Sequence, residues 1–176
     1  MMNQAALEQM WDVFRQKYGV YLRLLDAIPA DCYASHPVPG MRTPAELAVH
    51  VSGSVVQDFT EGVANGRITG HEDNTEQKLA AELGGKPAIM AYAVRCFEQA
   101  SDAITRIGDA ELSAMVTTPW GTWPGWLALQ IMSDEFLHHR GQLTAYVRAC
   151  GAEPAFIWDF EGNAAEYRPR AEPATR

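Results

Sequence analysis

The chain has 176 residues, enough to bury one full hydrophobic core, and its 47% hydrophobic and 20% charged residues are ordinary for a soluble globular domain. Fourteen basic against 22 acidic residues give a net charge of −8, which argues against nucleic-acid binding. No apolar run approaches a membrane span, no signal-peptide pattern opens the chain, and Cys32, Cys96 and Cys150 form no Cys-x-x-Cys motif. We therefore expect one cytoplasmic domain over residues 1–176, with reduced thiols and an ordered core from about 4 to 167.

The first predicted helix runs from about Ala5 to Ala27. Its apolar side chains recur at helical spacing, at Met10, Phe14, Tyr18, Tyr21, Leu22 and Leu25. Trp11 widens this face and is expected to pack in the core, and Pro29 ends the helix. Residues 29–42 then form a proline-rich connection, in which His36 precedes a proline and is expected to be an exposed loop residue.

The second predicted helix begins with a capping box. Thr43 can cap the helix, Pro44 suits the first helical position, and Glu46 completes the box. The helix is apolar around most of its circumference and stops at Asn65-Gly66, so we expect it to be central in the fold. His50 lies on its inward side. A core histidine taken alone is more often a hydrogen-bonded structural residue than a metal ligand, and both interpretations stay open at this point.

Residues 66–85 are polar and contain glycines. We expect a short helix over Thr75–Glu82, and we expect His71, which stands beside two acidic residues, to be solvated. A third long helix follows from Pro87 to about Ile107, with an apolar face at helical spacing, and Gly108 closes it.

Residues 108–125 are expected to form a loop before the last long helix. The loop contains Trp120 and Trp123, which either pack in the core or form the rim of a pocket at one end of a helix bundle. After the last helix the chain is rich in aromatic residues. We expect Trp158 and Phe160 to fold back over the bundle, and the chain to be frayed from about Arg168.

The last predicted helix, from about Trp126 to Cys150, carries most of the chemistry. Its apolar stripe contains Met132, Phe136, Leu143 and Tyr146. His139 falls inside the stripe and Glu135 lies one turn earlier at its edge, so a carboxylate and an imidazole point the same way. Asp134 and His138 are also four apart, but their helical neighbours are mostly small or polar. We therefore expect them to form a hydrogen-bonded pair on the surface.

Two segments together resemble one known family. Thr43-Pro44-x-Glu46-Leu47-x-x-His50 on the second helix resembles the DinB/YfiT-like metalloenzymes, and so does His138-His139-Arg140-Gly141-Gln142-Leu143 on the last helix, followed by Gly151-x-x-Pro154. The resemblance spans roughly Gln4 to Trp158. It implies an all-α fold, a four-helix bundle in up-down-down-up order, which is often dimeric and carries a divalent metal on three side chains.

The resemblance also implies which residues bind the metal. By position, His50 matches the first ligand of the family and His139 the last. The family commonly has another histidine one turn before the last ligand, where this chain has Glu135. A related branch, the mycothiol-dependent maleylpyruvate isomerases, is similar to this chain in having a His, Glu, His pattern of the same spacing. The implied ligands are therefore His50, Glu135 and His139. Two imidazoles and one carboxylate suit zinc, nickel or ferrous iron, and leave positions open for water or a substrate thiolate.

Four further residues are candidates for the surroundings of this metal. Gln142 shares the face of Glu135 and His139 and is expected to orient a ligand by a hydrogen bond. Trp120 and Trp123 are candidates for the substrate pocket. Arg140 is a candidate for binding the carboxylates of a thiol cofactor, as is Arg42, although a structural or interfacial role for Arg140 stays open.

The function of such a site is open among three hypotheses. The first is a metal-dependent S-transferase or isomerase that acts on a small-molecule substrate with a low-molecular-weight thiol such as mycothiol or bacillithiol. A metal-dependent hydrolase is a close variant. The third is a non-catalytic, dimeric stress-response or binding protein, in which His50, Glu135 and His139 form a buried polar network without metal. No residue is assigned a catalytic role.

The position of the segment Trp120–Pro124 distinguishes these hypotheses. If the protein is an enzyme, we expect this segment to line an open cleft; if the polar network is only structural, we expect it to fill the end of the bundle. The chain contains no His-Glu-x-x-His motif, nucleophile elbow or glycine-rich phosphate loop, so peptidase, esterase and nucleotide chemistry lose support. The aromatic tail and the broad apolar second helix favour a homodimer.

Overall fold

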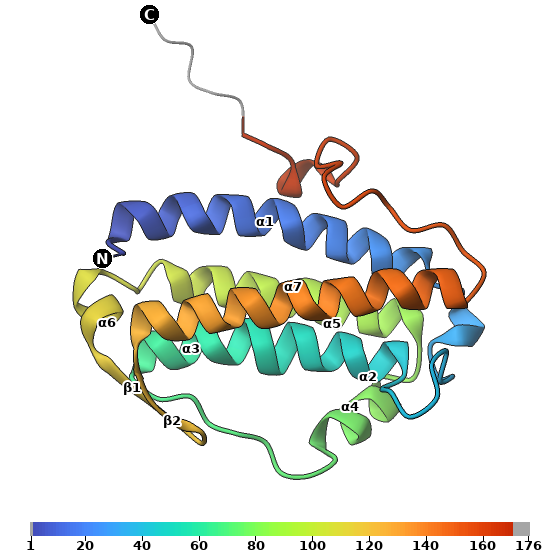
Figure 1. Ribbon diagram of the computed structural model, residues 1–176, viewed down its shortest axis with the longest axis horizontal. Coiled ribbons are helices and arrows are strands. Elements are labelled where there is room, and N and C mark those ends of the chain that lie inside the picture. Colours follow the sequence, from blue (N-terminus) through green and yellow to red (C-terminus); the bar gives the residue numbers. More distant parts are fainter. Residues whose placement is uncertain (1, 171–176) are drawn as a thin grey trace, which may run out of the picture.

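The structure is a computed structural model that describes residues 2–170, and long helices packed against one another make up most of it (Figure 1). The helices are α1 (Gln4–Ala27), α2 (Pro44–Val49), α3 (Asp58–Asn65), α4 (Thr75–Leu83), α5 (Lys86–Ile104), α6 (Asp109–Ser113) and α7 (Gly125–Ala149). Between α2 and α3 lies the π-helical segment η2 (His50–Gln57), and η1 (Ala30–Cys32) and η3 (Ala165–Tyr167) are short 3-10 turns. Within residues 2–170, no helix is long and apolar enough to cross a membrane.

The segments α2, η2 and α3 follow one another without a break and form one helical rod over residues 44–65, which we call the central rod. It begins with the predicted capping box: the Thr43 hydroxyl accepts from the Glu46 N–H at 3.2 Å, and the Glu46 carboxylate accepts from the Thr43 N–H at 2.8 Å. It ends at Gly66, whose φ of 77° is a left-handed conformation that suits glycine.

The middle of the central rod winds as a π-helix, a form that often occurs at functional sites. At Gly53 in this segment, an added Cβ would lie 2.2 Å from the hydroxyl oxygen of Tyr92 on α5. A larger residue at this position would therefore require the Tyr92 side chain to shift. The π-helical segment begins at His50, so the irregular winding coincides with the first residue of the candidate site.

An aromatic cluster joins the long helices in the core. Phe136 of α7 is fully buried, and its ring centroid lies 4.6 Å from that of Phe14 and 5.6 Å from that of Tyr21, both on α1. Trp11 is buried, as predicted, and stacks on Phe14 at 5.0 Å. The hydroxyl of Tyr18, also buried, donates to the Ala93 carbonyl at 2.8 Å. These large buried rings, whose polar atoms have hydrogen-bond partners, hold α1 and α7 together.

The prediction of a loop over residues 108–125 is wrong. This segment contains α6 and a hairpin of two strands, β1 (Met115–Thr118) and β2 (Gly121–Pro124), paired antiparallel with Val116 opposite Trp123. Side chains alternate between exposed and buried along β1. The Ile68 N–H also donates to the Thr117 carbonyl at 2.9 Å, which fastens the hairpin to the chain that follows α3. The alternation was too short to stand out in the sequence.

The prediction for the C-terminal segment is wrong in two respects. Trp158 is 59% exposed and does not cover the bundle, whereas Phe160 is half-buried against the core. Arg168 is not frayed, because its carbonyl accepts from the guanidinium of the buried Arg15 at 2.8 Å. Arg15 also donates to the Glu166 carbonyl, so a buried cation that needs acceptors holds this segment on α1. Residues 171–176 of the predicted tail lie outside the described residues.

Candidate metal site

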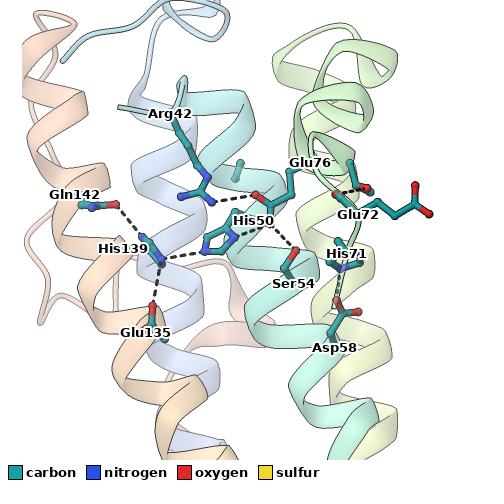
Figure 2. Close-up of polar contacts among 12 residues, drawn as sticks. Arg42, His50, Ser54, Asp58, His71, Glu72, Glu76, Glu135, His139 and Gln142 are labelled. Atoms are coloured by element: carbon teal, nitrogen blue, oxygen red, sulfur yellow. Dashed lines mark hydrogen bonds and ion pairs between the residues drawn. The ribbon is translucent and has the colours of Figure 1, made fainter. Parts of the chain in front are cut away.

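His50 on the central rod and His139 on α7 face each other (Figure 2). Their Nε2 atoms are 3.1 Å apart, and their rings are perpendicular. The Glu135 carboxylate lies 3.5 Å from the same Nε2 atom of His139. His139 is 6% exposed while His138 is exposed, as their helical neighbours predict. The structure thus places His50 and Glu135, two of the ligands that the resemblance implies, each within 3.5 Å of the third, His139.

Hydrogen bonds at the other ring nitrogens fix the state of both imidazoles. His50 Nδ1 lies 2.6 Å from the Glu76 carboxylate, and His139 Nδ1 lies 2.8 Å from the amide oxygen of Gln142. Both oxygens are acceptors, so each Nδ1 donates a hydrogen, and a neutral ring then carries its lone pair on Nε2. The Gln142 amide group donates at its other end to His138 at 3.1 Å, which fits this orientation of the amide.

Two neutral rings in this state point lone pairs at each other across 3.1 Å. Such lone pairs repel unless a cation, either a proton or a metal ion, lies between them. Burial lowers the pKa of His139, and the neighbouring imidazoles of His50 and His138 lower it further, although Gln142 and Glu135 act in the opposite direction. A lowered pKa favours the neutral ring, which is the form that binds metals.

Glu76 is a functional candidate that the sequence did not reveal. It stands on α4, 26 residues from His50, and it also accepts from the Ser54 hydroxyl at 2.7 Å and from Arg42 at 3.2 Å. Burial alone would raise the pKa of Glu76, but the bonds from His50 and Ser54 and the charge of Arg42 outweigh it and lower that pKa from 4.5 to about 2. Glu76 is therefore an ionised carboxylate that holds His50 in place.

The donor set, two imidazoles and one carboxylate, suits a divalent metal in its chemistry, and two of its three separations are close to those of a metal site. Bonds of about 2.0–2.1 Å in a tetrahedral zinc site place two ligand atoms roughly 3.3–3.4 Å apart. The separations of 3.1 Å between the two imidazoles and 3.5 Å from His139 to Glu135 lie on either side of that value. Within residues 2–170, however, no group of three or more His, Cys, Asp or Glu side chains meets the geometry of a complete metal site.

A cavity of about 520 Å³ adjoins these residues, and His50 and Glu135 form part of its wall. Trp120 and Trp123 of the hairpin also line it, which favours the pocket interpretation of the two tryptophans over a filled bundle end. Trp120 is 64% exposed and stacks on Phe59 of the central rod at 6.3 Å. The walls are therefore part aromatic and part acidic, and they include His50 and Glu135 but not His139.

The two candidate arginines lie in different environments. Arg42 lines the cavity, with 40% of its side chain exposed. Arg140 does not line it and is 6% exposed, and its Nη1 atom has no hydrogen-bond partner among the described residues. Burial lowers the pKa of Arg140. Of the two, Arg42 is therefore the one that reaches the cavity.

The prediction that Asp134 and His138 form a hydrogen-bonded pair on the surface is wrong. Asp134 accepts from Gln130 at 3.0 Å, and His138 accepts from Gln142 at 3.1 Å. Each residue is thus paired with a glutamine four positions away on the same helix face, which competes with their own contact. His71 is exposed, as predicted for a solvated residue, and its Nε2 atom also lies 2.5 Å from the Asp58 carboxylate.

Comparison with known proteins agrees with this architecture. The DinB superfamily matches residues 13–143, from α1 to the site residues on α7. A solved structure that is similar, a DinB-like protein, YjoA, from Bacillus subtilis, is 21% identical with a TM-score of 0.65, and the match covers 82% of this chain and 94% of that one. At this identity the likeness concerns the fold. No curated protein matches the chain. On the match over residues 13–143, the chain belongs to the DinB superfamily.

Proposed function

We propose that this protein is a divalent-metal-dependent enzyme that acts on a small molecule together with a low-molecular-weight thiol, as an S-transferase or isomerase. One observation carries the proposal: the Nε2 atoms of His50 and His139 face each other at 3.1 Å while each Nδ1 atom is held by an acceptor. This arrangement calls for a cation between the rings. A bound zinc, nickel or ferrous ion would supply a Lewis acid that lowers the pKa of a thiol or of water.

In this proposal His50, Glu135 and His139 hold the ion. Glu135 is the ligand that would have to adjust its position, because its side chain is 51% exposed and contacts only the imidazole of His139 among the described residues. Glu76 and Gln142 fix the tautomers of His50 and His139, so that both lone pairs stay directed at the ion. The cavity on the side of His50 and Glu135 leaves room for a thiol beside them.

The cavity wall suggests how a substrate is held. Arg42 can pair with a carboxylate of the thiol cofactor or of the substrate while Glu76 keeps its guanidinium in position at 3.2 Å. Trp120 and Trp123 offer flat apolar surfaces that displace water from one side of the cavity. These residues bind and orient the substrate, and the proposal leaves its identity to experiment.

We further propose a cytoplasmic homodimer whose four long helices follow the up-down-down-up order. The three cysteines are free thiols, which suits a reducing compartment. Phe156 and Trp158 are 68% and 59% exposed, and a second subunit is a reason for such side chains to lie on the surface. The net charge of −8 supports a small-molecule substrate over nucleic acid.

Metal titration of the untagged, metal-free protein tests the proposal. We expect one equivalent of Zn²⁺, Ni²⁺ or Fe²⁺ per chain to bind by calorimetry and to remain through gel filtration, as measured by ICP-MS. The loaded protein is then assayed with a panel of thiols and electrophiles. Protein that stays unoccupied after dialysis against all three ions would refute the proposal and leave a structural His/Glu/His network in its place.

Replacing Glu76 with glutamine is expected to weaken Zn²⁺ binding about 10- to 100-fold, because His50 loses the charged acceptor that orients it and increases its basicity. Glu72→Gln is the matched control, since Glu72 lies just before α4, is exposed, and has no side-chain hydrogen bond to His50 or His139 among the described residues. Competition with a fluorescent chelator measures both affinities. Equal affinities for the two variants would show that Glu76 does not support the site.

A further inference from the structure

The cavity beside the candidate metal site differs in chemistry along its length. Figure 1 shows α4 beside the α2 end of the central rod and the hairpin beside its α3 end. On the side of α4, Arg42 and Glu76 line the cavity as an ion pair at 3.2 Å. The apolar side chains of the lining come from the second half of the rod, the segment after α3, the hairpin and α7. They are Val55, Phe59, Ile68, Trp120, Trp123 and Ile131, and we call this part of the cavity its apolar end.

Trp120 is the most exposed side chain of the apolar end. Its indole stacks on the ring of Phe59, with the centroids 6.3 Å apart and the planes 17° from parallel. Phe59 is buried, whereas Trp120 is 64% exposed, and among the described residues no other aromatic ring stacks on it. A large apolar side chain that stays open beside a cavity is more typical of a ligand site than of a packed core.

Hydrogen bonds hold the turn that carries Trp120. The Trp120 N–H donates to the Thr118 hydroxyl at 3.1 Å, and that hydroxyl donates to the Gly121 carbonyl at 2.9 Å. The turn also packs against the segment after α3, where a Cβ added at Gly70 would lie 2.9 Å from Pro119 Cγ. The indole is therefore held on Phe59 without a ligand, and a ligand that binds there has little ordering of the protein to offset.

The apolar end reaches to one helical turn from a proposed metal ligand. Ile131 and Glu135 both line the cavity and are four residues apart on α7, which corresponds to roughly 6 Å along the helix. A group bound at the apolar end therefore lies at a distance from the reacting atoms. It acts by holding the substrate in position, because binding energy from a remote part of a substrate orients its reacting centre.

We propose that the apolar end binds a planar aromatic group of the electrophilic substrate and that Trp120 selects this group, in an inference that rests on the proposed thiol chemistry. The aromatic group lies against the indole, roughly one helical turn from the atom that reacts. The polar thiol cofactor occupies the other end, where Arg42 meets its carboxylate. A flat ring gains stacking on an indole that a saturated group of similar size does not gain.

The first test needs neither metal nor turnover. Each of the five tryptophans gives an indole N–H signal in a nitrogen–proton correlation spectrum, and replacement by phenylalanine assigns each signal. In the metal-free protein, we expect 2-naphthylmethanol to shift the signals of Trp120 and Trp123 and to leave that of Trp158, which does not line the cavity. Its saturated analogue, decahydro-2-naphthylmethanol, should bind at least about threefold more weakly. An unmoved Trp120 signal, or equal affinity for the two alcohols, would overturn the proposal.

Two exposed tryptophans provide a matched pair of variants. Trp120→Ala should weaken the binding of 2-naphthylmethanol about 3- to 10-fold, whereas Trp120→Phe keeps a ring and most of the affinity. Trp158→Ala is the control, because Trp158 is 59% exposed and lies outside the cavity, and it should keep the wild-type affinity. Melting temperatures show whether each variant is folded. Wild-type affinity in Trp120→Ala, or an equal loss in Trp158→Ala, would mean that the ring binds elsewhere and would reject the role of Trp120.

The second test uses the metal-loaded protein, with 2-mercaptoethanol or cysteine as the thiol and benzyl acrylate or cyclohexylmethyl acrylate as the electrophile. The thiol sulfur bonds to the terminal carbon of the acrylate, and the thiol proton goes to the carbon beside the carbonyl. We expect kcat/KM for the benzyl ester to exceed that for the cyclohexylmethyl ester at least about threefold, and this preference to disappear in Trp120→Ala. Equal kcat/KM values in the wild type, or a preference that persists in Trp120→Ala, would contradict the selection by Trp120.

The two proposals fail in different ways. A protein that binds no metal, or that binds metal and turns over neither ester, contradicts the proposed thiol chemistry itself. The spectra of the metal-free protein then decide whether the apolar end binds an aromatic group. A shifted Trp120 signal with tighter binding of the planar alcohol supports this binding, and any other result rejects it.

Discussion

His139→Ala is expected to lower the affinity for Zn²⁺ by more than about 100-fold, whereas His138→Ala leaves it within about threefold. Loss of a residue that only orients a ligand costs 10- to 100-fold, so loss of a ligand costs more. The two histidines are adjacent on α7, but His139 is 6% exposed and faces His50 at 3.1 Å, while His138 is exposed. Calorimetric titration of the two variants, with ICP-MS of each, measures the difference.

The same comparison separates a metal site from a structural network. His50→Ala is expected to reduce Zn²⁺ affinity as strongly as His139→Ala, because each removes one of the two facing nitrogens. If the pair were instead a buried hydrogen bond between the rings, removing one partner would cost the metal-free protein about 1–3 kcal/mol. Unfolding in the presence of a chelator tests this. Unchanged Zn²⁺ binding in both variants would mean that the ion lies elsewhere.

Phe136→Ala is expected to destabilise the protein by about 3–5 kcal/mol. The Phe136 ring is fully buried and packs on Phe14, Tyr18 and Tyr21, with centroids 4.6, 5.8 and 5.6 Å away. Alanine removes the ring and leaves a cavity between α1 and α7 that these aromatic neighbours can fill only in part. Urea unfolding followed by circular dichroism gives the free energy of unfolding of each variant.

Phe156→Ala is the matched control for this prediction. It removes the same atoms from a side chain that is 68% exposed in the single chain, and at protein concentrations too low for the proposed dimer we expect a change within about 0.5 kcal/mol. A loss below about 1 kcal/mol for Phe136→Ala would mean that the core closes around the missing ring. A loss at Phe156 as large as that at Phe136 would point to a buried position for Phe156, as in the proposed dimer.

Helical periodicity was sufficient to predict the main helices and to predict which face of α7 carries the candidate site. The apolar stripe through Met132 and Phe136 predicted that His139 points inward and His138 outward, and the structure agrees. The capping box at Thr43 predicted where the central rod begins. These predictions succeed because they depend on which face of one helix is buried, and the spacing of residues along that helix determines the face.

Only the tertiary structure revealed the partners of the histidines. Glu76 reaches His50 because α4 packs beside α2, and His71 reaches Asp58 because the segment after α3 lines the same cavity. The sequence also missed the hairpin and the anchoring of Arg168. These contacts join polar residues on short elements and connecting segments. Such segments have no hydrophobic period to predict from, and their positions follow from how the long helices pack.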